Sequence, residues 1–403
     1  MTASVTCLGC GCACDDIEVV TRESRIVGAA NACELGLRWF GDGRVPARSR
    51  VAGRDVDRSE AIGAAAALLT NASRPLVYLA PDLSCEAQRH AAGIADALGA
   101  ALDSVTSATA MSSILAAQER GRAGATLGEI RRRADLVVLW NVDPSSRYPR
   151  YLSRYAPATP GRTCLRVETT KADEVATLTA LAAIVAGRVG DTAGTGAIWD
   201  RARSLAPRLL AGRYVAIVAD GEPDGSDPGD PGRAAALIAL AQALNGPTRA
   251  ALSVLRAGGN RTGAEAVMTW QTGYPAAVDF TRGHPRYRPY DGTAAARLAA
   301  GDADALLVVG AAALIPPQLL RLMARLPRAI VGPRASDSAL ASGGAAPVVI
   351  DTGIAGIHEG GTAMRMDDVP LPLRPSLPGP PDTADIVSEL GARVRRRPEV
   401  AAR

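Results

Sequence analysis

The sequence has very little lysine and few aromatic residues. Of its 403 residues 45 are lysine or arginine, yet Lys171 is the only lysine, and phenylalanine occurs twice and histidine three times. The cations are spread along the chain among 41 acidic residues. A net charge of +4 therefore does not indicate nucleic-acid binding, and we expect no nucleic-acid partner.

Long hydrophobic runs are also missing. The stretches "AIGAAAALL" and "LTALAAIVAG" are short and rich in alanine, whereas a membrane-spanning helix needs about 18 or more consecutive apolar residues. The first residues lack the basic-then-apolar pattern of a signal peptide. We therefore expect a folded cytoplasmic protein without a membrane span. In such a protein the seven cysteines favour metal binding over disulfides.

Short apolar runs alternate with longer segments rich in alanine and leucine. Residues 85–100 are typical of a helix that Gly99 ends. Buried strands are predicted within residues 74–81, 134–144, 212–223, 303–316 and 328–334. Continuous apolar strands that alternate with helices indicate parallel sheets covered on both faces. The predicted fold class is α/β with several parallel-sheet lobes.

Two segments rich in glycine and proline suggest where the chain divides. Asp220–Arg233 is predicted to be a surface loop, and Pro370–Asp382 is a second break. The short arginine-rich helix after the second break is expected to be solvated rather than docked on a partner. The predicted domains are a cysteine-rich N-terminal lobe (1–50), a first α/β lobe (51–220), a second α/β lobe (221–372) and a C-terminal tail (373–403).

Five cysteines cluster near the N-terminus. Cys7, Cys10, Cys14 and Cys33 follow the spacing C-x2-C-x3-C-x18-C, with Cys12 as a spare. Three thiolates from one loop and a fourth from a later segment could surround a [4Fe-4S] cluster. They could equally hold a tetrahedral zinc ion. The sequence therefore predicts a metal site and leaves the metal open.

A series of segments carries a family resemblance. They include "CLGCGCACDDIEV", "ATLGEIRRRADLVVLWNVDPSSRYPRYLSRY", "MTWQTGYPAAVDFTRGHPRYRPYDG" and "GIAGIHEGGTAMRMDDVP". In this order, and up to about residue 372, they resemble the B subunit of formylmethanofuran dehydrogenase, a member of the molybdopterin and tungstopterin oxidoreductases. The resemblance implies a reduced architecture like that of the formate dehydrogenases, with the cysteine-rich segment as a small N-terminal lobe.

The chain departs from this family where the family binds its redox metal. A family segment Cys-His-Gly-Pro-Ser supplies the tungsten or molybdenum ligand, and Thr109 stands at the ligand position in "TSATAMSSILAAQERG". A neutral hydroxyl is a poor substitute for a thiolate. The family's Asp-Pro-Arg-Lys-Thr, which helps to hold the pyranopterin nucleotide, reads Glu168-Thr169-Thr170-Lys171-Ala172 here, and "NVDP" replaces a glycine-containing loop. We expect no tungsten or molybdenum pterin.

A B subunit without its redox metal resembles that of the formyltransferase/hydrolase complex of methylotrophic bacteria. The resemblance implies a non-catalytic scaffold that packs with the A, C and D subunits. That complex transfers a formyl group from formyl-tetrahydromethanopterin to a methanofuran-type carrier and hydrolyses it to formate, in formaldehyde oxidation. One alternative is an active tungsten or molybdenum dehydrogenase subunit, and another is an iron–sulfur electron-transfer module.

Six arginines are candidate contacts for the polyglutamate of such a carrier. Guanidinium groups bind carboxylates through two parallel hydrogen bonds. The ordinary alternative is that they pair with acidic residues of the same chain. The candidates are Arg147, Arg150, Arg154, Arg282, Arg286 and Arg288.

Overall fold

The computed structural model describes residues 2–190, 193–222, 229–343 and 347–396. It divides into two compact units. Unit 1 comprises Met1–Ala108 together with Gly258–Arg403, and unit 2 comprises Thr109–Ala257. Unit 2 is therefore inserted into the sequence of unit 1, and the helix α4 (Val105–Thr109) ends at the boundary.

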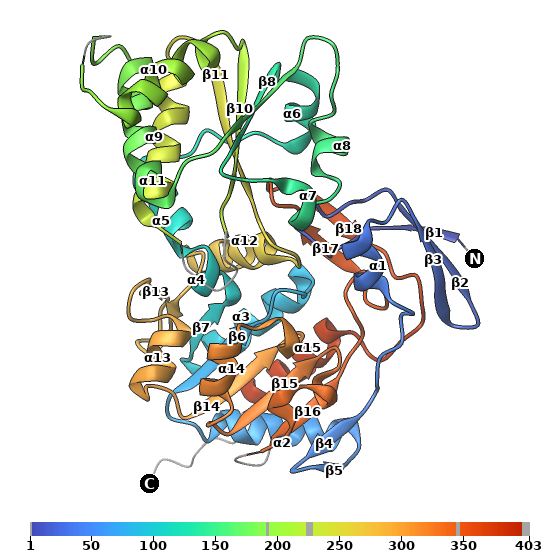
Figure 1. The fold of residues 1–403 in the computed structure, drawn as a ribbon. Coiled ribbons are helices and arrows are strands. Elements are labelled where there is room, and N and C mark those ends of the chain that lie inside the picture. Colours follow the sequence, from blue (N-terminus) through green and yellow to red (C-terminus); the bar gives the residue numbers. More distant parts are fainter. Residues whose placement is uncertain (1, 191–192, 223–228, 344–346, 397–403) are drawn as a thin grey trace. The chain divides into compact units, whose positions relative to one another are not determined.

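Unit 1 is built on a nine-stranded mixed sheet (Figure 1). Its five central strands are parallel, and two antiparallel strands flank them on each side. In spatial order the strands are β13 (Arg286–Tyr287), β12 (Val278–Asp279), β7 (Ala101–Ser104), β6 (Pro75–Leu79), β14 (Ala305–Val309), β15 (Arg328–Gly332), β16 (Val348–Asp351), β4 (Ser49–Val51) and β5 (Arg54–Asp55).

Both faces of this sheet are covered by helices. Val77 and Leu79 of β6 pack into one apolar cluster, whereas Leu76 and Tyr78 of the same strand pack into another, because successive side chains of a strand point to opposite faces. The first cluster includes α2 (Arg58–Thr70), α3 (Cys85–Leu98), α12 (Arg261–Thr272) and α15 (Thr383–Arg395). The second includes α13 (Ala294–Ala300) and α14 (Pro317–Met323), beside the 3-10 turns Ala312–Leu314, Ala335–Asp337 and Ala339–Ala341.

Two small antiparallel sheets complete unit 1. The N-terminal segment forms β1 (Thr2–Val5), β2 (Ile17–Arg22) and β3 (Arg25–Ala30), followed by α1 (Glu34–Phe40). The cysteine loop lies between β1 and β2. Later in the chain, β17 (Gly361–Met364) pairs with β18 (Pro370–Leu373).

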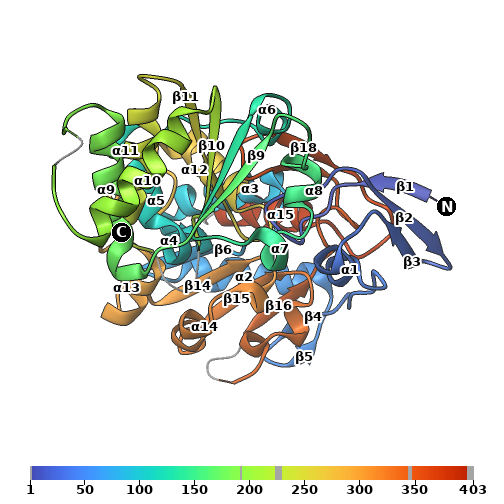
Figure 2. The ribbon, with the colours of Figure 1, turned by 45° about the horizontal axis from the view of Figure 1, so that its top comes forward.

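Unit 2 has a four-stranded parallel sheet in the order β11 (Arg249–Leu255), β10 (Tyr214–Asp220), β8 (Leu136–Trp140) and β9 (Thr163–Val167). One face packs against α5 (Met111–Arg120), α9 (Lys171–Val185), α10 (Ala197–Leu210) and α11 (Pro231–Leu244). The helices α6 (Leu127–Arg133) and α8 (Tyr151–Tyr155) lie on the other side (Figures 1 and 2). A short helix, α7 (Pro144–Arg147), follows β8.

The two parallel sheets share one topology. In each, the chain runs from a central strand to a neighbour on one side and then continues on the other side of the central strand. The order reverses between β6 and β14 in unit 1 and between β8 and β10 in unit 2. In open α/β sheets ligands bind outside the carboxyl ends of the strands at such a switch point.

The predicted α/β class with parallel-sheet lobes is confirmed. Each of the predicted strands is present, and the helix predicted in residues 85–100 is α3, which Gly99 ends in a left-handed conformation with φ +64°. The predicted division at residues 220 and 221 does not coincide with the division into units, because it falls between β10 and α11 inside unit 2. Of the predicted surface loop Asp220–Arg233, residues 223–228 lie outside the described residues, and Pro231 already begins α11.

The C-terminal helix differs from the expected solvated tail. Ile386, Val387, Leu390 and Val394 of α15 are buried in the core of unit 1. Its amphipathic spacing places one apolar stripe against the sheet and leaves the arginines on the outer side. Residues 397–403 of the predicted tail lie outside the described part. Among the described helices, none has the length and apolar character needed to cross a membrane.

Candidate functional site

The N-terminal cysteines are brought together by a tight loop. The N–H of Cys7 donates to the carbonyl of Cys14 at 2.9 Å, and the N–H of Ala13 donates to the carbonyl of Cys10 at 3.1 Å. Cys33 is the N-cap residue of α1. Burial raises the pKa of the Cys7 thiol, and the nearby Cys10, Cys14 and Cys33 raise it further. Cys12, the spare, is also buried.

The loop is fastened to the rest of unit 1 through its backbone. The N–H of Gly259 donates to the carbonyl of Leu8 at 2.8 Å, and the N–H of Met366 donates to the carbonyl of Gly11 at 3.1 Å. A Cβ atom at Gly258 would lie 2.6 Å from the carbonyl oxygen of Gly9. Glycine at position 258 therefore permits a close approach that no other residue would allow.

The predicted metal ligands share this locality, but their side chains do not form a coordination site. Among the described residues, no three histidine, cysteine, aspartate or glutamate side chains are arranged to hold a metal ion. Cys7, Cys10, Cys14 and Cys33 offer the right donor atoms for a cluster or for zinc. The cluster or zinc at these cysteines therefore stays a prediction.

Thr109 is the last residue of α4 and is fully buried. The residues that follow it, Ala110, Met111 and Ser112, are buried as well. None of the four carries a thiolate, and a buried neutral hydroxyl donates poorly to a soft metal. The position at which the sequence analysis expects the family's metal ligand is therefore buried in this chain.

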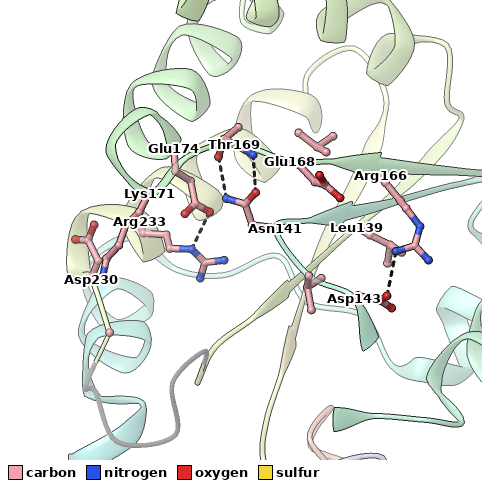
Figure 3. Close-up of a pocket in the computed structure, with 13 residues that line it drawn as sticks. Leu139, Asn141, Asp143, Arg166, Glu168, Thr169, Lys171, Glu174, Asp230 and Arg233 are labelled. Atoms are coloured by element: carbon pink, nitrogen blue, oxygen red, sulfur yellow. Dashed lines mark hydrogen bonds and ion pairs between the residues drawn. The ribbon is translucent and has the colours of Figure 1, made fainter. Parts of the chain in front are cut away.

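The two other departures from the family meet in one cavity of unit 2 (Figure 3). The cavity has a volume of about 650 Å³ and lies at the carboxyl ends of β8 and β9, next to the first turns of α9 and α11. Its lining includes Asn141 and Asp143 of "NVDP" and Glu168, Thr169 and Lys171 of "VETTKAD". It is completed by Leu139, Val142, Arg166, Val167, Glu174, Gly229, Asp230 and Arg233.

Two side chains, Asn141 and Glu174, organise the wall of this cavity (Figure 3). The Asn141 carboxamide accepts from the N–H of Thr169 at 2.7 Å and donates to its hydroxyl at 2.8 Å. The buried Glu174 carboxylate accepts from Arg233 Nε at 2.8 Å and from the indole N–H of Trp140 at 3.0 Å. Side chains of this chain therefore hold the wall together across the ends of the strands.

The charges of the lining nearly cancel. Three cationic side chains face four acidic ones, which gives a formal balance of minus one. Arg233 is paired with Glu174, and Arg166 lies 3.6 Å from Asp143. The Lys171 side chain is exposed and makes no hydrogen bond or ion pair within the described residues. The cavity therefore lacks the excess of positive charge that a polyanion requires.

The candidate arginines Arg147, Arg150 and Arg154 lie in unit 2. Arg147 forms an ion pair with the buried Asp220 and lies 5.6 Å from the ring centre of Tyr148. Arg154 lies 5.4 Å from the ring centre of Tyr155. Arg150 is the N-cap residue of α8 and also has interactions within the protein. These arginines have intramolecular roles, and their predicted contact with a carrier stays a prediction.

The candidates Arg282, Arg286 and Arg288 lie in unit 1. Arg286 and Arg288 approach the buried Asp279 at 3.1 Å and 3.3 Å, and Arg297 approaches it at 2.6 Å. Burial would raise the pKa of Asp279, but hydrogen bonds from Thr281 and Arg297 hold it well below its usual range. Arg282 is exposed and makes no hydrogen bond or ion pair within the described residues.

The sequence reasoning missed the partners of these arginines. Asp279, Glu174 and Asp220 each neutralise an arginine that is distant in sequence or lies on another element. Asp220 and Asp279 both stand at the end of an apolar strand, where an acidic residue in an arginine-rich chain is a usable signal for an ion pair. The pairing itself has no local pattern, because tertiary packing decides it.

Comparisons with known proteins show which proteins this chain resembles. No protein-family model matches the chain. The B subunit of the tungsten-containing formylmethanofuran dehydrogenase 2 of Methanocaldococcus jannaschii is 30% identical over 414 residues, which cover 92% of each chain. The B subunit of the formyltransferase/hydrolase complex Fhc of Methylorubrum extorquens is 30% identical over 329 residues, 77% of this chain and 86% of that one.

The fold also matches a solved structure. A chain of the formyltransferase/hydrolase complex FhcABCD from Methylorubrum extorquens, in complex with methylofuran, matches with a TM-score of 0.72 and 26% identity. The match covers 86% of this chain and 98% of that one. Sequence and fold agree over most of the length, and the chain belongs to the family of formylmethanofuran dehydrogenase B subunits.

Proposed function

We propose that this chain is the non-catalytic B subunit of a formyltransferase/hydrolase complex. In this role it assembles with the A, C and D subunits, which transfer a formyl group from formyl-tetrahydromethanopterin to a methanofuran-type carrier and hydrolyse the product to formate. The near-complete coverage of a chain from the FhcABCD complex supports this role. So does the conversion of the family's nucleotide-binding segments into a wall of internal contacts.

Thr109 is the observation that carries the proposal. A dehydrogenase of this family needs a thiolate or selenolate on its redox metal, and the residue at that position is a fully buried threonine. Without the ligand, a redox reaction has no metal to proceed on, while formyl transfer and hydrolysis need no electrons. The subunit then contributes structure rather than chemistry.

Purification of the tagged chain from its own host tests the proposal. We expect three further subunits to co-purify, with formyl-transfer and hydrolase activity and with far less than one tungsten or molybdenum per complex. A stoichiometric content of either metal would favour the active dehydrogenase, which the name of the Methanocaldococcus jannaschii relative suggests. Visible absorbance that bleaches on reduction, in a chain that purifies without the other subunits, would favour the electron-transfer module.

The same preparation tests the N-terminal cysteines. We propose that any metal bound there is structural, as a cluster or as zinc, because no redox metal is expected beside it. Iron and zinc are measured after anaerobic purification of the wild type and of a C7S/C10S variant. Equal metal contents in the two proteins would contradict a site at these cysteines.

Of the six candidate arginines, we propose Arg282 as the one that contacts the carrier. Arg282 has no ion-pair partner within the described residues, whereas Arg286 and Arg288 are held by Asp279. We expect Arg282→Ala to lower the carrier content of the purified complex severalfold, because a bidentate contact with a carboxylate is lost. Arg54→Ala, at another exposed arginine of unit 1, serves as the control, and equal losses would contradict a specific contact.

A further inference from the structure

The cavity of unit 2 has the usual position of a phosphate site. In α/β proteins the backbone N–H groups of turns after the strands, together with the N-termini of the following helices, bind phosphate groups. The resemblance to the family implies a pterin nucleotide here. Whether this chain fits such a ligand depends on whether those N–H groups are available.

The first of these donors is occupied by Asn141. Asn141 directly follows β8, and Thr169 stands two residues beyond β9. The carboxamide oxygen of Asn141 accepts from the N–H of Thr169 at 2.7 Å, and its amide group donates to the Thr169 hydroxyl at 2.8 Å (Figure 3). Both polar groups of Thr169 are therefore bound to another side chain of the cavity wall.

The other turns around the cavity are closed in the same way. In each case a side-chain oxygen accepts from the backbone N–H that a phosphate would use. These pairs are Asp143 with the N–H of Ser145 at 3.0 Å, Thr170 with the N–H of Asp173 at 3.2 Å, and Asp230 with the N–H of Gly232 at 2.8 Å. Two of the three capping groups are carboxylates, which also repel an approaching phosphate.

We propose that Asn141 is an internal plug that makes this cavity reject ligands carrying a phosphate. The plug takes the place of the ligand on Thr169, and the capped turns with the net negative lining leave Lys171 as the single unpaired cation of the lining within the described residues. The residues present therefore do not fit a pterin dinucleotide. The cavity persists as space at the carboxyl ends of β8 and β9, with its anion-binding donors closed.

The conformation of Asn141 makes this proposal testable by one substitution. Asn141 has φ +47°, in the left-handed region that glycine adopts without strain. Asn141→Gly therefore removes the plug and frees the Thr169 N–H without forcing the backbone.

The probe is GDP, with binding measured by calorimetry on the purified complex. Wild type is expected to show no saturable binding up to about 1 mM, and Asn141→Gly is expected to bind at least about tenfold more tightly. Adding Asp230→Gly frees a second N–H and removes one carboxylate, so the double variant should bind more tightly again. Asn141→Asp is the matched control, because it keeps an acceptor on Thr169 and should stay as weak as wild type.

Several results would overturn the proposal. Wild type that binds GDP as tightly as Asn141→Gly would show that the plug has no effect. A variant that binds guanosine as tightly as GDP would show that the phosphates are not recognised. If the variant does not fold, amide hydrogen exchange of wild type decides: slow exchange at Thr169 that GDP leaves unchanged supports the plug, and fast exchange contradicts it.

This inference deepens the proposed function and rests on it, since a scaffold needs no open phosphate donors. The two fail separately. Loss of co-purifying subunits would contradict the proposed function and leave the plug intact. Binding of GDP by wild type would contradict the plug and leave the assembly of the complex untouched.

Discussion

The parallel strands of the two units have similar sequences, but the packing at their carboxyl ends differs. β6 reads "PLVYL" and β8 reads "LVVLW", and an aspartate follows three residues after each strand, Asp82 and Asp143. Asp82 is buried, and burial raises its pKa to about 6, whereas Asp143 is exposed and the N–H of Ser145 lowers its pKa. The aspartate after the strand is therefore buried in unit 1 and exposed to solvent in unit 2. We call the carboxyl ends of the strands the closed edge in unit 1 and the open edge in unit 2.

Close backbone packing fills the edge of unit 1. Asp82 accepts from the N–H of Ala311 at 2.8 Å, and a Cβ atom at Gly310 would lie 2.7 Å from the Asp82 carboxylate. A Cβ at Gly259 would lie 2.2 Å from the carbonyl oxygen of Pro81. In unit 2 the corresponding space is the cavity of about 650 Å³. Topology places a potential site at both edges, and local side chains decide whether space remains there.

The largest effect is expected from adding one methyl group to the closed edge. Gly259→Ala should lower the free energy of unfolding by about 3 kcal/mol or more, because the new Cβ meets backbone and the residue has φ +88°. Urea unfolding of the purified protein measures it. Gly301→Ala, with φ +68° but open space around the Cβ, should cost only about 1 kcal/mol. Equal costs would mean that the edge is not packed tightly.

The second-largest effect on the free energy of unfolding is expected from the buried carboxyl group of Asp82. In the native protein its pKa is about 6, while the unfolded carboxyl titrates near its ordinary value, so the native state binds the proton more tightly. Its contribution to stability is therefore present below about pH 4 and is lost as the pH rises to about 6, by about 3 kcal/mol in total.

Asp82→Asn keeps an acceptor for Ala311 and cannot ionise. Relative to wild type it should be more stable at pH 8 than at pH 4, by about 3 kcal/mol. Urea unfolding of both proteins at the two pH values measures this difference. Parallel pH profiles would show that Asp82 is hydrated, like a carboxylate at the open edge.

An intermediate effect is expected at the open edge. Glu174→Ala removes the acceptor of the Trp140 indole and of Arg233. In a closed interior the loss of one ion-pair partner costs about 3–5 kcal/mol. Water in the cavity should reduce the cost to about 2 kcal/mol. Glu168→Ala, also on the cavity wall, is the control and should change stability by less than about 0.5 kcal/mol.

The smallest effect on stability is expected where a substitution only fills space in the cavity of unit 2. Val142 is half-buried on the cavity wall, so Val142→Phe should change the free energy of unfolding by less than about 1 kcal/mol. Val308, in the middle of β14 and fully buried, offers the same substitution at the closed sheet, where overpacking should cost about 2 kcal/mol or more. Thermal unfolding of both variants makes the comparison, and similar costs would contradict an open edge in unit 2.

Much of the fold could be predicted from local sequence. β6, β8 and β14 are apolar along their whole length, and β10 and β15 are apolar except for a charged residue at one end, Asp220 and Arg328. Fully buried parallel strands produce this pattern. The arginines at the end of α15, Arg393 and Arg395, favour a solvated helix when the sequence is read alone. Its buried stripe becomes visible only against α3 and the sheet, with which it packs.

The candidate site was predicted in part. The departures at "NVDP" and "VETTKAD" indicated from sequence the loss of a nucleotide pocket, and both line the cavity. The contact of Asn141 with Thr169 could not be predicted, because the two residues meet only through the parallel pairing of β8 with β9. The partners of the arginines were hidden for the same reason. Contacts between strands carry no local signal.

The insertion of unit 2 into unit 1 also sets an order of folding. Unit 2 is one continuous stretch, so its sheet is complete once residue 257 has left the ribosome. In unit 1, β14 pairs with β6, with Leu306 opposite Leu76, so the centre of that sheet stays unpaired until the later segment has been synthesised. Domains generally fold as units during synthesis. Between the completion of unit 2 at residue 257 and the synthesis of β14, therefore, the apolar strand β6 lacks its partner on that side, and we expect a chaperone to bind the nascent chain at this stage.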